Sequence, residues 1–268
     1  MGQQASSPKP GAKLQVIGAG LPCTANTTLN RALEILLDGP VYHGGTQVCK
    51  AAPTHMRSWI AIMERTPTRG PDDEKFITRT IPRLLDGYVA TTDGPGMCFV
   101  PELVQLYPDA KVVCLTRDLN DWVRSWEPMA DGTMRWYLRG LLLPLLAPMR
   151  LLPQYMDALM AGRWEEMYHL SEAEKKAPGP VVWKRHIENL KRAVPADRLV
   201  FYDVKEGWGP LCEALGREVP KGVPFPAIIY DDGIQEFAQR EVMRAIVRWL
   251  AIMGSAVGAY WAWMSYPF

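Results

Sequence analysis

A turn near the start of the chain carries groups suited to binding an anion. Residues 18–28, GAGLPCTANTT, follow an apolar strand pattern and lead into a helix pattern, and we call them the glycine turn. Backbone N–H groups and the positive end of a helix favour phosphate or sulfate at such a place. The hydroxyls of Thr24, Thr27 and Thr28 add donors. The glycine–lysine pair of nucleotide hydrolases and the third glycine of a dinucleotide fingerprint are both absent, which argues against those ligands.

A second anion-binding pair lies later in the chain. Arg117 ends the strand pattern KVVCLT, and Ser125 follows eight positions later on a predicted helix. A guanidinium is a planar donor fork that is always charged, so this pair is placed to hold one phosphate from two sides. The alternative is an ion pair between Arg117 and Asp118 or Asp121.

Strand and helix patterns alternate around these residues. Apolar runs predict strands at 13–20, 88–92, 111–116 and 198–204. Helical spacing of leucine and alanine predicts a helix at 27–37, and another is expected at 102–107. This alternation predicts an α/β fold with a three-layer parallel sheet.

Composition sets the broad class. The chain has 268 residues, 48% of them hydrophobic, and a formal net charge of +1. That length favours one large α/β domain, and the charge gives no indication of nucleic-acid binding. The five cysteines show no C-x-x-C spacing and the four histidines are isolated, so we expect reduced thiols and no metal site.

Both ends of the chain suggest a membrane. The start, MGQQAS, matches the pattern for N-myristoylation of Gly2; the alternative is a polar, disordered tail. Residues 249–268 carry no charge, follow three arginines and end in aromatic residues. A run of about 20 apolar residues spans the hydrocarbon core, which favours a single-pass helix with the domain on the cytoplasmic side. A buried or in-plane helix is the alternative. Gly254 and Gly258 form a GxxxG step that predicts a homodimer contact.

Residues 133–160 interrupt the α/β alternation. Their centre, GLLLPLLAP, is strongly apolar and is broken twice by proline, which predicts a kinked helical insertion. Such an insertion is suited to lining a substrate pocket or dipping toward a bilayer, and ordinary helix packing is the alternative.

These segments, in this order, resemble a known family. The chain is similar to the fungal-rich sulfotransferase-like group of P-loop proteins, which are often labelled NAD-dependent epimerases. The resemblance covers most of residues 13–226. The shared segments are GxGLPxT, ALEILL, GPVYH at 39–43, TTDGP at 91–95, YPDAKVVCLTRDLNDWVRSW, His186, PADRLVFYDVKEGW at 195–208, PLCEALG and PFP.

The resemblance implies sulfuryl transfer from 3′-phosphoadenosine-5′-phosphosulfate (PAPS) to an acceptor. In that reading Arg117 and Ser125 hold the 3′-phosphate. His43 is the first candidate for the base that takes the acceptor proton, and Asp93 the second; a structural histidine is the alternative for His43. The 5′-phosphosulfate is held by Leu21, Cys23, Thr24, Asn26, Thr27 and Thr28, and the late loop near the nucleotide consists of Lys205, Gly207 and Trp208.

The glycine turn departs from the family pattern GLPRTGTTSLK. This chain has Cys23 in place of arginine and Asn30 in place of lysine, so two cations are missing. Ala25 replaces glycine where the backbone needs a positive φ. Each missing charge-assisted contact is worth about 1.5–3 kcal/mol. The turn also has Asn26 in place of threonine and Thr28 in place of serine.

Three readings of function follow. The first is a membrane-tethered sulfotransferase acting on a lipophilic small molecule, in secondary metabolism. The second is a sulfotransferase-fold enzyme that has lost sulfuryl transfer and cyclises or rearranges an apolar substrate. The third is a non-catalytic membrane scaffold. The expected organisation is a disordered tail at 1–12, a sulfotransferase-like domain at 13–238 and a transmembrane helix at 245–268.

Overall fold

The centre of the molecule is a parallel sheet. A computed structural model describes residues 4–132, 136–146, 149–230 and 234–266. Its five strands lie in the order β2-β3-β1-β4-β5, and every neighbouring pair is parallel. The predicted parallel α/β sheet is therefore confirmed. The strands are β1 (Val16–Gly18), β2 (Val41–His43), β3 (Ala90–Thr92), β4 (Lys111–Leu115) and β5 (Leu199–Tyr202).

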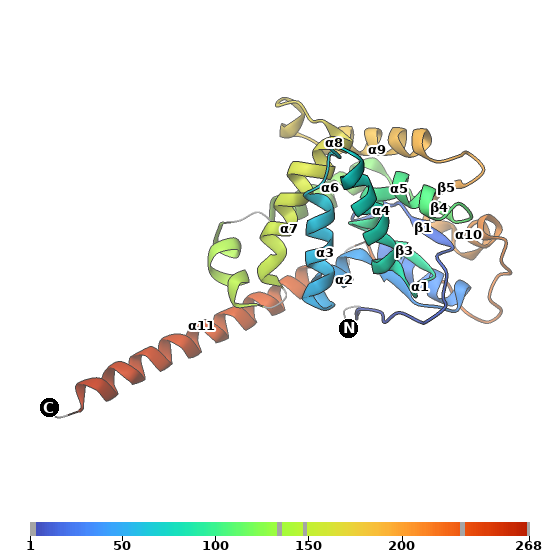
Figure 1. The fold of residues 1–268 in the computed structure, drawn as a ribbon. Coiled ribbons are helices and arrows are strands. Elements are labelled where there is room, and N and C mark those ends of the chain that lie inside the picture. Colours follow the sequence, from blue (N-terminus) through green and yellow to red (C-terminus); the bar gives the residue numbers. More distant parts are fainter. Residues whose placement is uncertain (1–3, 133–135, 147–148, 231–233, 267–268) are drawn as a thin grey trace.

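Helices connect the strands, as parallel pairing requires (Figure 1). The α-helices are α1 (Asn26–Leu37), α2 (Gly44–Lys50), α3 (Pro53–Met63), α4 (Pro71–Leu85), α5 (Val100–Leu106), α6 (Leu119–Gly132), α7 (Leu152–Leu159), α8 (Glu165–Tyr168), α9 (Gly179–Ala193), α10 (Trp208–Leu215) and α11 (Ile234–Met264). The 3-10 and π segments are η1 (Gly96–Phe99), η2 (Leu138–Leu142), η3 (Leu143–Leu145), η4 (Met149–Leu151), η5 (Met160–Trp164), η6 (Glu174–Lys176) and η7 (Val204–Glu206).

Alternate residues of each strand pack into two separate hydrophobic cores. Ile17 and Val112 point to one face, where α3, α4, α5, α6 and α9 pack. Val16 and Val113 point to the other face, where α1 and α10 pack. Because side chains alternate along a strand, a sheet covered on both faces reads as a continuous apolar run, as KVVCL does. The molecule is thus three-layered, as predicted.

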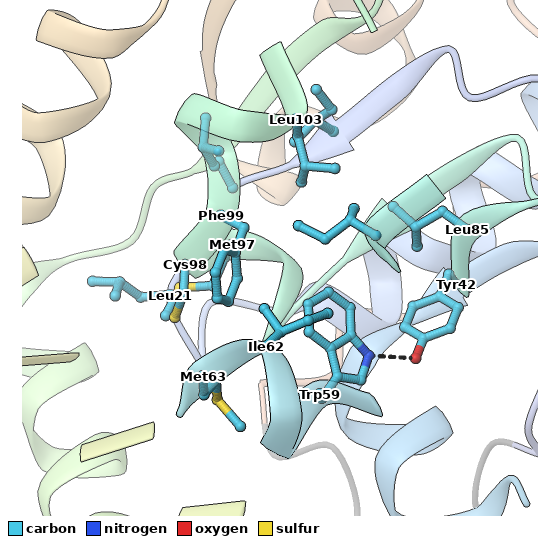
Figure 2. Close-up of a cluster of buried hydrophobic side chains, with 14 of the residues drawn as sticks. Leu21, Tyr42, Trp59, Ile62, Met63, Leu85, Met97, Cys98, Phe99 and Leu103 are labelled. Carbon is cyan, nitrogen blue, oxygen red and sulfur yellow. Dashed lines mark hydrogen bonds between the residues drawn. The ribbon is translucent and has the colours of Figure 1, made fainter. Parts of the chain in front are cut away.

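The larger core is built around aromatic side chains (Figure 2). Trp59 of α3 is fully buried, and its indole N–H donates to the hydroxyl of Tyr42 on β2 at 2.8 Å. A buried indole and a buried phenol each need such a partner. Leu21 of the glycine turn lies in the same core, so the turn is fixed to the domain by its own side chain.

The C-terminal helix leaves the domain. α11 projects from the body as one long rod, and its far half has no neighbouring element (Figure 1). Within it Gln239–Met264, 26 residues, is long and apolar enough to cross a membrane. The helix begins at Ile234, earlier than the predicted 245, because the amphipathic segment before the apolar run continues the same helix.

The N-terminal segment contacts the domain. The hydroxyl of Ser6 donates to the carbonyl of Val41 at 2.5 Å, and the Gln47 amide donates to the Ser6 carbonyl at 2.8 Å. The expected disorder of residues 1–12 therefore does not extend to Ser6. Gly2 lies outside the described residues.

Candidate functional site

The glycine turn lies at the carboxyl edge of the sheet. β1 ends at Gly18, β2 at His43 and β3 at Thr92, and His43 pairs in register with Thr92. β4 ends two residues before Arg117. Ligands of open α/β sheets bind outside the carboxyl ends of the strands. The topology thus brings the predicted anion-binding and base residues to one edge.

The turn is held open by internal hydrogen bonds. The hydroxyl of Thr24 donates to the Leu21 carbonyl at 2.6 Å, and the Asn26 amide donates to the same oxygen at 2.8 Å. A Cβ at Gly20 would lie 2.8 Å from the Thr24 hydroxyl, so a larger residue there would displace this arrangement. Cys23 and Ala25 have positive φ values of 64° and 71°, which side chains with a Cβ rarely adopt.

Backbone donors remain unused in this turn. Among the described residues, no acceptor bonds the N–H groups of Thr24, Ala25, Asn26 or Thr27. These residues are buried, and the Oδ1 atom of Asn26 also has no partner there. Buried polar groups are nearly always satisfied by protein, water or ligand, so this cluster fits a bound anion with its waters.

The threonine hydroxyls are used inside the protein. Thr28 donates to the Ala227 carbonyl at 3.1 Å and accepts from the N–H of Ile229 at 2.9 Å. Thr27 lies 3.4 Å from Nε2 of His43. The hydroxyls expected as ligand donors therefore organise the turn, and the backbone supplies the free donors.

Arg117 and Ser125 meet as the spacing predicts. One guanidinium nitrogen of Arg117, NH1, donates to the Cys23 carbonyl at 2.8 Å and to the Ser125 hydroxyl at 3.1 Å. The Ser125 hydroxyl in turn donates to the Asp121 carbonyl at 3.1 Å. Arg117 makes no ion pair with Asp118 or Asp121, and Asp121 instead pairs with Arg124. The alternative reading of Arg117 as a salt-bridge residue is therefore wrong.

The free edge of Arg117 points to a ligand role. Among the described residues its Nε and NH2 groups have no hydrogen-bond partner. The Tyr230 ring lies over the guanidinium, 4.1 Å from its carbon, and fixes its plane. A planar fork with one edge pinned and the other edge free is preorganised for a phosphate.

A short segment covers this site. Residues 225–230, which we call the strap, run from Phe225 to Tyr230 and bond Thr28 at their centre. Phe225 packs edge-on against Trp208, with ring centroids 5.0 Å apart. Sequence reasoning missed the strap, although its first two residues belong to the motif PFP at 224–226, which was part of the family resemblance.

The late loop is less directly involved. The Trp208 indole is buried and donates to the Val223 carbonyl at 2.9 Å. The Gly207 carbonyl accepts from the Tyr202 hydroxyl at 2.6 Å, and Lys205 is exposed. Among the described residues, no hydrogen bond or ion pair joins these three to Arg117 or to the glycine turn. The sheet places them at the same edge, but Trp208 serves mainly to hold the strap.

The two base candidates differ in which of their side-chain atoms are available to accept a proton. Nδ1 of His43 accepts from the Thr46 N–H at 3.3 Å, so the neutral ring carries its proton on Nε2, facing Thr27. Oδ2 of Asp93 accepts from the Gly45 N–H at 3.2 Å and lies 3.9 Å from Nδ1 of His43. Oδ1 of Asp93 has no partner in the described part of the chain. The geometry therefore favours Asp93, the second candidate, as the group able to accept a proton, and gives His43 a structural role.

His186 supports the turn from below. Its Nε2 donates to the Ala19 carbonyl at 2.7 Å, and Nδ1 accepts from the Tyr168 hydroxyl at 3.0 Å. Burial lowers the pKa of His186 to about 4, so it is neutral near pH 7. His186 also lines a cavity of about 280 Å³ between α5, α8 and α9, whose lining includes neither Arg117 nor a residue of the glycine turn.

Comparison with known proteins identifies a family. The family model described as "Sulfotransferase domain" matches residues 15–231. "Ava biosynthesis cluster protein M" of Aspergillus versicolor is 26% identical, over 79% of this chain and 83% of the relative. A sulfotransferase structure from Alicyclobacillus acidocaldarius aligns with 87% of this chain and 94% of its own at 16% identity and a TM-score of 0.40. A shikimate kinase from Bacteroides thetaiotaomicron aligns with 67% of this chain at 13% identity and a TM-score of 0.28.

Proposed function

The chain belongs to the sulfotransferase domain family, and on that premise we propose that it transfers a sulfuryl group from PAPS to a lipophilic small molecule. The relative named for a biosynthesis cluster supports a place in secondary metabolism. The long apolar α11 supports attachment to a membrane, where a lipophilic acceptor collects.

The observation that carries the proposal is the Arg117 fork beside the glycine turn. Arg117 donates through NH1 to the Cys23 carbonyl and the Ser125 hydroxyl, and its NH2 and Nε groups are left to bind a phosphate. The free N–H groups of residues 24–27 directly follow the Cys23 carbonyl that Arg117 bonds, and they suit the phosphosulfate end. To bind the 3′-phosphate itself, Ser125 must turn its proton away from the Asp121 carbonyl.

The reaction needs one proton acceptor. PAPS supplies the sulfuryl group: its sulfur bonds to the acceptor oxygen while the sulfur–oxygen bond to the 5′-phosphate breaks. The hydroxyl proton of the acceptor goes to Oδ1 of Asp93. The Gly45 N–H orients that carboxylate through Oδ2, and His43 caps α2 beside it.

A second candidate function rests on the altered turn. The Cys23 thiol contacts the Met129 sulfur at 3.7 Å, and buried Asn30 has no hydrogen-bond partner among the described residues. Neither position carries a cation, so charge on a departing 5′-phosphate is poorly stabilised. An enzyme that rearranges an apolar substrate without PAPS would show this pattern.

Calorimetric titration of the purified protein with 3′-phosphoadenosine-5′-phosphate (PAP) tests the proposal. We expect binding that Arg117→Ala abolishes and Arg117→Lys weakens, because lysine lacks the fork. Arg124→Ala is the matched control, since Arg124 lies on the same segment, is exposed and pairs with Asp121. Absence of PAP binding in the folded wild type would exclude PAPS as the donor and favour the second candidate. Equal binding by Arg117→Ala and the wild type would exclude Arg117 as the phosphate ligand.

A further inference from the structure

An exposed apolar segment lies at the base of α11. We call residues 136–151 the apolar loop; the structure describes 136–146 and 149–151 of it. Trp136 is 75% exposed and Leu141 is 46% exposed. Trp136 and Tyr137 also pack edge to face. Single exposed apolar side chains are common on proteins, so the inference depends also on where this loop lies.

The apolar loop is bonded to α11 at the point where the charge-free run of that helix begins. The Trp249 indole donates to the Leu141 carbonyl at 2.8 Å, and Arg248 donates to the Leu145 carbonyl. Beneath these bonds the buried side chains of Leu143, Leu146 and Met149 pack on Ala245. Trp249 is where the charge-free run of α11 begins. The loop is therefore held where a spanning helix would enter the hydrocarbon.

The N-terminus approaches the same side of the domain. Gln47 of α2 bonds Ser6, and Cys49 of α2 packs against the cluster beneath the apolar loop. Gly2 precedes Ser6 by four residues, at most about 14 Å of extended chain. An acyl chain on Gly2 would therefore be attached within that length of chain from Ser6, which is bonded to α2 near the joined end of α11 (Figure 1).

Arginines lie in and near the apolar loop and the adjoining part of α11. Arg150 is exposed at the end of the apolar loop, and its guanidinium has no hydrogen-bond or ion-pair partner among the described residues. Arg139 pairs with Asp157, and Arg244 pairs with Glu241. Arginine beside tryptophan is the composition of the headgroup region of a bilayer.

We propose that the apolar loop is a second membrane contact, with Trp136 and Leu141 inserted at the headgroup–acyl boundary of the bilayer that α11 crosses. This inference rests on the membrane attachment in the proposed function. The loop then holds the domain flat against the lipid, with α2 at the surface. Because His43 caps α2 and lies beside Asp93, the base region faces the phase in which a lipophilic acceptor dissolves.

Tryptophan quenching by lipid tests this contact. The full chain is reconstituted in phosphatidylcholine–phosphatidylserine vesicles whose acyl chains are brominated close to the headgroup. Trp136→Phe is expected to remove a component of the quenched emission. Trp183→Phe, whose ring packs on Trp122 inside the domain, is expected to remove none. Equal quenching in Trp136→Phe and wild type would overturn the proposal.

A charge variant supplies a second readout. Leu141→Glu is expected to reduce quenching of Trp136, because a carboxylate resists entry into the acyl boundary. Ile35→Glu is the matched control, since Ile35 of α1 is 43% exposed and outside the loop. It should leave quenching unchanged, and equal effects of the two variants would contradict a local contact.

Membrane extraction distinguishes failure of the loop contact from failure of the α11 anchor. Extraction with alkaline carbonate reports on α11 alone. If the protein resists extraction but Trp136 is not quenched, the anchor stands and the loop contact is overturned. If all variants are extracted, the membrane attachment itself fails. A dimer in which Trp136 is shielded from brominated lipid would show that the loop binds a second copy and would also overturn the proposal.

Discussion

At the scale of single residues, the candidate site combines an arginine fork that has a free edge with an altered turn. Arg117 is pinned through NH1 and through the face of Tyr230, while its other edge is free. Cys23 and Asn30 stand where the family has cations, and both are buried. Burial raises the pKa of nearby Glu34. The proposed nucleotide end of the site thus has a cation, and the proposed sulfuryl end lacks the two of the family pattern.

Restoring one cation should strengthen nucleotide binding. A charge-assisted bond is worth about 1.5–3 kcal/mol, so Cys23→Arg is expected to tighten PAPS binding roughly 10- to 100-fold. Calorimetric titration measures this directly. Cys23→Met is the control, because it adds length beside Met129 without charge. An equal gain in both variants would mean that packing, not charge, is responsible.

His186 makes stability depend on pH. The native state keeps it neutral to about pH 4, while an unfolded histidine takes up a proton below about pH 6.5. Stability should therefore fall as pH drops from about 6.5 to about 4, by on the order of 3 kcal/mol. His186→Gln keeps a donor and an acceptor but does not titrate. Urea unfolding of both proteins across this range should give a flatter profile for the variant, and parallel profiles would contradict the assignment.

At the scale of elements, a buried arginine joins the helices beside the larger core. Arg163 of η5 donates to both carboxylate oxygens of Glu102 on α5, at 2.7 and 2.6 Å, and to the Cys98 carbonyl at 2.7 Å. It also reaches Glu166 at 2.9 Å. Burial raises the pKa of Glu102 and Arg163 opposes that rise. This pair holds η1 and α5 against η5 and α8.

Removing one partner should be costly. Glu102→Ala leaves a buried guanidinium only partly compensated and is expected to lower the free energy of unfolding by about 3 kcal/mol. Glu166→Ala should cost less than about 1 kcal/mol, because the Glu166 side chain is 33% exposed and water screens its pair with Arg163. Chemical denaturation of both variants measures the difference. Similar losses would show that the Arg163–Glu102 pair contributes no more to stability than the Arg163–Glu166 pair.

Sequence patterns predicted most elements. The helix at 27–37 corresponds to α1, and the four strand predictions correspond to β1, β3, β4 and β5. The strand β2 within GPVYH was not predicted, and its length is not the reason, because β1 and β3 are also three residues long. The insertion forms short 3-10 and π segments, because its prolines interrupt regular helical bonding.

At the scale of the whole molecule, spacing predicted the Arg117–Ser125 pair but not what surrounds it. Residues eight apart at a strand end and on the following helix meet through local geometry. The strap reaches Thr28 across about 200 residues of chain, a tertiary contact that no local pattern encodes. The choice between His43 and Asp93 likewise depended on which nitrogen and oxygen were already bonded.

The whole molecule is also predicted to pair through α11. Gly254 and Gly258 are exposed, and no atom lies within 4 Å of a Cβ built at either. Gly258→Leu is expected to weaken association, because close approach of two helices needs a small residue there. Energy transfer between donor- and acceptor-labelled chains in bilayers measures it. Ala256→Leu, on the opposite side of the helix, should have no effect, and a loss of transfer in both variants would argue against this face.

The strap ends at Tyr230, and α11 starts four residues later at Ile234. The tyrosine that stacks on Arg117 thus lies close in sequence to the start of the apolar helix. Shortened versions made for crystallisation should therefore keep every residue through Tyr230. A chain cut ahead of Phe225 would lose the ring over Arg117 and the bonds to Thr28, so its failure to bind PAP would not count against the proposed function.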